Sequence, residues 1–71
     1  MTADEWIAEF ASALAIEPPD DATVATLLEL AGVAAHASER TAAPIACWLV
    51  GRTGLDASAA LAHARDVAAP A

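Results

Sequence analysis

The hydrophobic positions of the chain recur at helical spacing in four segments, which are separated by proline, glycine and aspartate. In the first segment, residues 3–15, the large apolar side chains follow the spacing i, i+1, i+4 and i+8, namely Trp6, Ile7, Phe10 and Leu14. This spacing places them on one face of a helix and leaves the acidic residues on the other. No segment alternates apolar and polar residues as a half-buried strand does. The pattern therefore predicts an all-α protein, a compact bundle of four short helices.

Capping residues predict where the helices begin. Thr2, with Glu5 three positions later, has the spacing of a capping box. Asp20 or Asp21 can cap the second helix, which follows a double proline that stops the first, and Asp56 can cap the fourth. The predicted helices span residues 3–15, 22–38, 42–52 and 56–68.

The second predicted helix is apolar around most of its circumference, which is typical of a helix that touches the others on more than one side. One face holds Val24, Leu27, Leu28, Ala31 and Ala35, and Leu30 and Val33 widen it. Gly32 lies inside this helix, where glycine costs about 1 kcal/mol relative to alanine. Close approach of another helix at Gly32, or a bend, would account for it.

The third predicted helix starts near Thr41, so that Pro44 falls in the first turn, where its missing N–H removes no hydrogen bond. A glycine ends it. We expect its large apolar side chains Ile45, Trp48 and Leu49 to lie in the core. Trp6 of the first helix is expected there as well. The fourth helix is weakly amphipathic, because alanine fills most of its apolar positions.

Length and charge limit the classes of function. Residues 1–71 make one small domain, and 22 of them are alanine. The net charge is −7, with three arginines and no lysine, which argues against binding to nucleic acid or to an anionic membrane. No apolar run reaches the roughly 20 residues of a membrane span, and the acidic N-terminus does not resemble a signal peptide. We expect a cytoplasmic protein.

The segment from His36 to Pro44 holds the main candidate chemistry. His36 and Arg40 are four positions apart and share a face if the second helix continues. In the first interpretation Arg40 is a structural latch, which binds backbone carbonyls or a carboxylate of another helix. In the second, His36 and Arg40 bind a small anionic ligand or cofactor beside Trp48, together with the free N–H groups of the third helix.

Other kinds of chemistry find little support. A metal site would need His36, His63, Cys47 and a carboxylate to converge without any short-range ligand pair. His63 is expected on the surface, and Cys47 beside Trp48 is typical of a small core residue. No catalytic triad, phosphate loop or carboxylate pair is present. We therefore expect a protein that is not an enzyme and uses no cofactor or metal.

The stretch AHASERTAAPIACWLVG is similar to the central motif of DUF6457, a family of small actinobacterial domains of unknown function. The matching positions are His36, Arg40, Ala42, Ala43, Pro44 and Gly51. The opening DEWIAEFASALAI resembles the Trp-containing first helix of that family. Its members also occur fused to molybdenum cofactor guanylyltransferase domains, which would imply an accessory role in molybdopterin cofactor maturation. This sequence has no nucleotidyltransferase domain, so that activity does not carry over.

Together these observations predict a non-catalytic helical module that binds a protein partner or a second copy of itself. A homodimer could bury the alanine stripe of the fourth helix. The alternative is a small anionic ligand or cofactor-binding domain that uses His36 and Arg40.

Overall fold

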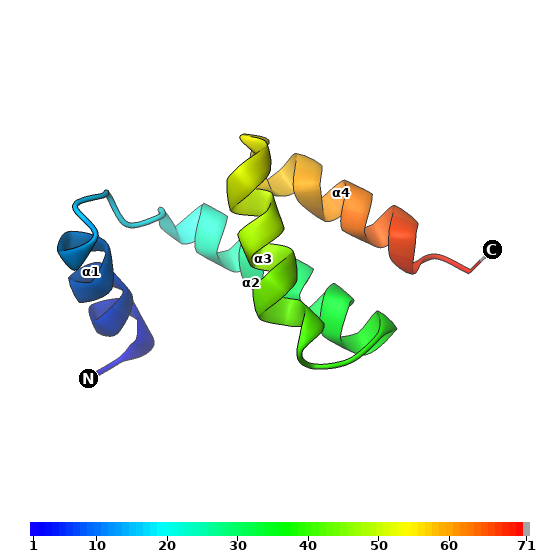
Figure 1. Ribbon diagram of the computed structural model, residues 1–71, viewed down its shortest axis with the longest axis horizontal. Helices are drawn as coiled ribbons and strands as arrows, with labels where there is room; N and C mark the ends of the chain where they lie inside the picture. Colours follow the sequence, from blue (N-terminus) through cyan, green and yellow to red (C-terminus); the bar gives the residue numbers. More distant parts are fainter. Residues whose placement is uncertain (71) are drawn as a thin grey trace.

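The computed structural model describes residues 1–70, and in this range it contains four helices and no strand (Figure 1). The helices are α1 (Ala3–Ala13), α2 (Asp21–Ala37), α3 (Ala42–Thr53) and α4 (Ala57–Ala68). The all-α prediction is confirmed, and each helix lies where the hydrophobic pattern predicts it. No helix in this range is long and apolar enough to cross a membrane.

The predicted capping residues begin three of the helices. The Thr2 hydroxyl accepts a hydrogen bond from the Glu5 backbone N–H, and the Glu5 carboxylate accepts one from the Thr2 N–H, both at 3.1 Å. Asp20 caps α2 by accepting from the Thr23 N–H at 2.7 Å. Asp56 caps α4 in the same way at 2.8 Å. Each cap satisfies backbone donors that have no partner inside the helix.

The end of α1 is closed by an alanine in an unusual conformation. Ala15 has φ +60°, in the left-handed region that usually selects glycine after a helix. This turn lets the Ala15 N–H donate to the Ser12 carbonyl and the Ile16 N–H donate to the Ala11 carbonyl, each at 3.0 Å. Residues up to Ile16 are therefore bonded to α1, and residues 17–20 alone connect this helix to α2.

The core lies where α2 packs against both α3 and α4. Its buried residues are Leu30, at 2% exposure, Ala60 and Leu61. Partly buried side chains surround them: Val33, Ala46, Cys47, Val50 and Ala64. The central position predicted for α2 is correct. Its buried face is centred on Leu30, however, and Leu28, which we placed on the core face, is 68% exposed.

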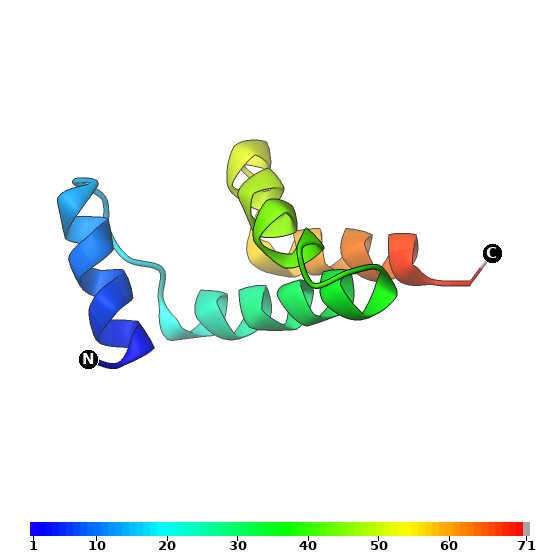
Figure 2. The same ribbon diagram turned by 60° about the horizontal axis from the view of Figure 1, so that its bottom comes forward.

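Helix α1 lies apart from this core, at the end of the molecule where α2 begins (Figures 1 and 2). Ile7 and Ala8 face the linker prolines and Val24 in the first turns of α2. In both views α3 stands between α1 and α4. Among the described residues, α1 contributes no side chain to the core around Leu30.

Two expectations about packing are wrong. Four side chains expected in the core are half exposed or more, because α1 does not cover α3 and the outer side of α3 faces solvent: Trp6 (55%), Ile45 (62%), Trp48 (62%) and Leu49 (54%). At Gly32 a Cβ atom would meet no other atom within 4 Å, so no helix approaches closely there.

Candidate functional site

The joint between α2 and α3 contains His36 and Arg40, the residues on which we expected chemistry. Backbone hydrogen bonds close this joint: the Ala42 N–H donates to the Glu39 carbonyl at 2.9 Å, and the Ala43 N–H donates to the Arg40 carbonyl at 3.2 Å. The Arg40 side chain is exposed and has no hydrogen bond or ion pair within residues 1–70. The predicted latch is therefore wrong, because the main chain makes the turn without the guanidinium.

The structure does not gather His36, Arg40 and Trp48 around one cavity. His36 is exposed on the last turn of α2 and borders an open hollow of about 570 Å³, whose described lining includes Gly32 but not Arg40. Trp48 lies on the outer side of α3, where the Arg52 guanidinium sits 5.5 Å from its ring centroid. Each of the three candidate side chains is exposed to solvent.

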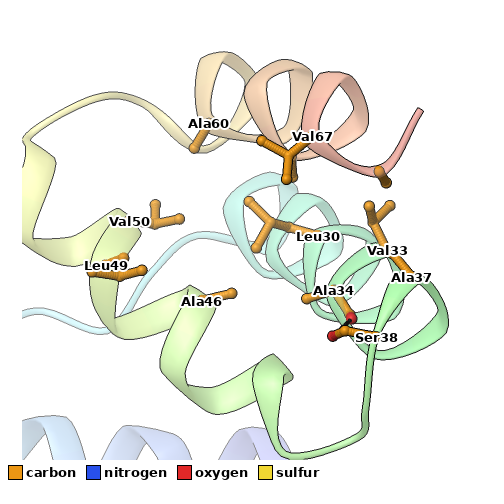
Figure 3. A pocket seen from close by; sticks show the side chains of 12 residues that line it. Leu30, Val33, Ala34, Ala37, Ser38, Ala46, Leu49, Val50, Ala60 and Val67 are labelled. Atoms are coloured by element: carbon orange, nitrogen blue, oxygen red, sulfur yellow. Dashed lines mark hydrogen bonds between the residues drawn. The ribbon is translucent and has the colours of Figure 1, made fainter. Parts of the chain in front are cut away.

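A second concavity is an apolar groove of about 440 Å³ between α2, α3 and α4, which we call the groove (Figure 3). Ser38 supplies the one polar side chain among its described lining residues, and its hydroxyl already donates to the Ala34 carbonyl at 2.7 Å. The apolar side chains that line it include Leu30, Val33, Leu49, Val50, Ala64 and Val67. A surface of this kind suits an apolar side chain better than an anion.

Sequence reasoning missed the groove. Its α4 wall is largely alanine, which the pattern marked only as a weak apolar stripe, and small side chains leave the space open. Val67 at the rim is 88% exposed, although it is one of only two large apolar residues in α4. One signal in the sequence could have predicted the groove: α4 has almost no large side chains to fill the space beside the large apolar residues of α3.

Two further apolar surfaces are exposed. The α1 stripe consists of Trp6, Phe10 and Leu14, each about half exposed, and its two aromatic rings stack with centroids 5.0 Å apart. The α3 stripe consists of Ile45 and Trp48, each 62% exposed. Large apolar surfaces that face water are uncommon on monomers and are typical of interaction sites.

The ionisable groups have mainly local structural roles. The backbone and side-chain hydrogen bonds of Thr2 lower the pKa of Glu5, and the side-chain and backbone hydrogen bonds of Thr23 lower the pKa of Asp20. Within residues 1–70 no three His, Cys, Asp or Glu side chains lie close enough together to hold a metal ion. His63 is exposed and Cys47 is half-buried against the core, as expected.

Comparison with known proteins identifies one matching family. The family model DUF6457, described as a domain of unknown function, matches residues 1–71. No curated protein and no solved structure matches the chain.

Proposed function

The chain belongs to the DUF6457 family over its whole length, and we propose that it is a non-catalytic module that binds another protein chain through exposed apolar helix faces. The observation that carries the proposal is the distribution of its large side chains. Only four hydrophobic residues are buried in the described chain, and two of them are alanines. Both tryptophans and the single phenylalanine are half exposed or more. Tryptophan is among the residues most enriched at the centres of protein interfaces.

The character of the exposed surface supports a protein partner. Trp48 carries the Arg52 guanidinium over its ring, so this part of α3 combines an aromatic anchor with a cation. No acidic residue occurs within α3. A helix or loop with apolar side chains and a carboxylate would complement this surface.

Photo-crosslinking tests the proposal. A photoreactive residue placed at position 48 of the full chain should form an adduct of defined mass in the cells that produce the protein. The same residue at position 63 is the matched control, because His63 is also exposed on a helix but lies outside both stripes. The absence of any adduct specific to position 48 would contradict the proposal.

The alternative, binding of a small anionic ligand at His36 and Arg40, is favoured by one observation: the Arg40 guanidinium has no carboxylate partner within residues 1–70. Titration of the chain with inorganic phosphate, followed by NMR, tests it. Binding should shift the resonances of both residues together, and the Arg40→Gln variant should abolish the shifts while leaving the helical spectrum unchanged.

A role near molybdopterin cofactor maturation, which the family resemblance implied, also stays a prediction. It is tested by whether the position 48 adduct contains a protein of that pathway.

A further inference from the structure

Helices α1 and α3 lie on the same side of α2, and each carries an exposed apolar surface. In both views the two helices run in the same general direction from N- to C-terminus. In Figure 2 both rise from one side of α2, α1 near its first residue and α3 near its middle. The three side chains of the α1 stripe and Trp48 of α3 are all half exposed or more. Packing α1 against α3 would remove both apolar surfaces from water at once.

Helix α1 is held in its position by few contacts. The helix pairs that pack extensively in the described chain are α2 with α3 and α2 with α4, and neither pair includes α1. Ala11 is the one buried residue of α1. Ile7 and Ala8 border an open hollow beside the linker prolines and Val24. An element with so little buried contact moves at a low cost in free energy.

The linker is long enough for α1 to reach α3. Because Ile16 is bonded to α1, residues 17–20 form the connection, and four residues span up to about 14 Å. Asp20, where the linker ends, lines a hollow together with Asp56 at the start of α4. Thr53, the last residue of α3, is three positions before Asp56, which is at most about 11 Å of chain. Packed helices keep their axes about 8–10 Å apart, so the C-terminal end of α1 can lie beside that of α3.

Charge favours α3 over the groove as the surface that α1 covers. Residues 1–17 hold four acidic side chains and no basic one, whereas residues 40–55 hold two arginines and no acidic side chain. Both arginines, Arg40 and Arg52, are exposed and have no carboxylate partner within residues 1–70. The described lining of the groove has no charged side chain. Opposite charges therefore attract α1 to α3, and no such attraction exists at the groove.

The same linker favours the chain's own α1 over the α1 of a second copy. A short linker holds the helix beside its target at an effective concentration on the order of millimolar. In a micromolar solution of the protein, the tethered helix therefore has an advantage of about a thousandfold over a helix from another chain.

We propose that α1 is a lid that closes on α3 of its own chain, so that Trp6 and Phe10 cover Trp48. The structure described above is the open form. Because the linker keeps the C-terminal ends together, the closed helices lie parallel, which brings the acidic first turn of α1 toward Arg40 at the beginning of α3. The inference rests on the proposed function, since it describes how access to that same site is regulated: the partner must displace α1 from Trp48.

Quenching of Trp48 fluorescence by acrylamide measures the closure. Trp6→Phe leaves Trp48 as the single tryptophan and keeps an aromatic ring on the α1 stripe. In this background Phe10→Glu should raise the quenching constant about twofold, the change that follows when a closed form holding about half of the molecules is lost. Ser12→Glu, the matched control, adds the same charge to α1 at an exposed position outside the stripe and should not raise the constant. Val67→Arg, at the rim of the groove, should also leave it unchanged.

A charge swap tests the parallel arrangement. Arg40→Asp and Asp4→Arg each bring like charges together in the closed form, so each should raise the quenching constant. The double variant restores opposite charges and should return the constant toward that of the background. Asp66→Arg makes the same change of charge at an exposed position of α4 and should have no effect. Circular dichroism of each variant confirms that its helices are retained.

Three results would overturn the lid. The first is a quenching constant that Phe10→Glu leaves unchanged. The second is an equal increase with Val67→Arg, which would place α1 in the groove. The third is protection of Trp48 that disappears when the protein is diluted from millimolar to micromolar concentration, which would identify a second copy as the occupant.

The lid and the proposed function fail in different ways. If the lid is correct, Phe10→Glu should increase the yield of the position 48 adduct in cells about twofold, as it increases the exposure of Trp48. An adduct that forms with the same yield in both chains, together with unchanged quenching, would overturn the lid and leave the proposed function standing. Quenching that changes as expected in a chain that forms no adduct would support the contact between α1 and α3 and contradict the proposed function.

Discussion

Helix α1 and the α2–α4 region both consist of alanine-rich helices with apolar side chains, yet they differ in what those side chains contact. In α2–α4 the central leucine and its small neighbours exclude water from a core that three helices share. In α1 the large aromatic residues contact one another on a half-exposed face, and Ala11 is the one buried residue of the helix. The difference shows that an amphipathic pattern forms a helix without determining which surface covers its apolar face.

The largest expected effect is the loss of stability when a core side chain is truncated, and it should distinguish the two regions. Leu30→Ala should lower the free energy of unfolding by about 2–5 kcal/mol, because it empties the centre of a small core. Phe10→Ala should cost far less in the dilute chain, where Phe10 is half exposed. Thermal unfolding followed by circular dichroism measures both. Equal losses in the two variants would show that α1 belongs to the same cooperative unit.

Removal of the helix caps should give an intermediate effect. Asp20→Ala removes the cap of α2 and should cost about 1 kcal/mol of global stability. Thr2→Ala removes the cap of α1 and should leave global unfolding nearly unchanged, while it accelerates amide hydrogen exchange in α1 alone. If Thr2→Ala left hydrogen exchange in α1 unchanged and lowered the melting temperature as much as Asp20→Ala, the distinction between the regions would fail.

Acid should weaken the same caps. The pKa of Asp20 is lowered below its usual value of 3.8 in the folded chain, so its contribution to stability is present above that value and is lost as the pH falls through the lower folded pKa. Asp20→Asn retains an oxygen that accepts the cap hydrogen bond but does not titrate. Its stability should therefore depend less on pH below about 4 than that of the unaltered chain. Glu5 has a lowered pKa for the same reason, and Glu5→Gln should alter the pH dependence of α1 alone.

The smallest expected effect belongs to the ion pair between Arg65 of α4 and Glu29 of α2. The atoms lie 2.9 Å apart, but both side chains are 61% exposed, so solvent screens the attraction. A double-mutant cycle with Arg65→Gln and Glu29→Gln should give a coupling of about 0.2–1 kcal/mol that decreases with salt. A coupling that does not respond to salt would contradict this description of the pair.

The features predicted correctly from the sequence are those decided within a few residues. Thr2, Asp20 and Asp56 cap helices by bonding to groups three positions away, so the local pattern is sufficient. The prolines before α2 and in the first turn of α3 also act on their own neighbours. The positions of the helices follow from these local rules.

The features that were missed depend on contacts between distant residues. Helix α2 is apolar on nearly every side, so its pattern could not decide between Leu28 and Leu30 as the buried residue. The spacing of apolar residues correctly placed Trp6 and Trp48 on apolar helix faces. It could not show that these faces are exposed to solvent. Arg40 lies at a helix end where a cation is favoured, yet the backbone of the turn already satisfies its own hydrogen bonds.

Gly32 lowers the stability of helix α2, although the space around it would admit a larger residue. A methyl group at this position would fit without displacing any atom, and alanine favours the helix by about 1 kcal/mol over glycine. The middle of the longest helix therefore has more backbone freedom than its packing demands, at a point two residues from the buried Leu30. Gly32→Ala is therefore a substitution by which an engineer could raise the heat tolerance of the chain.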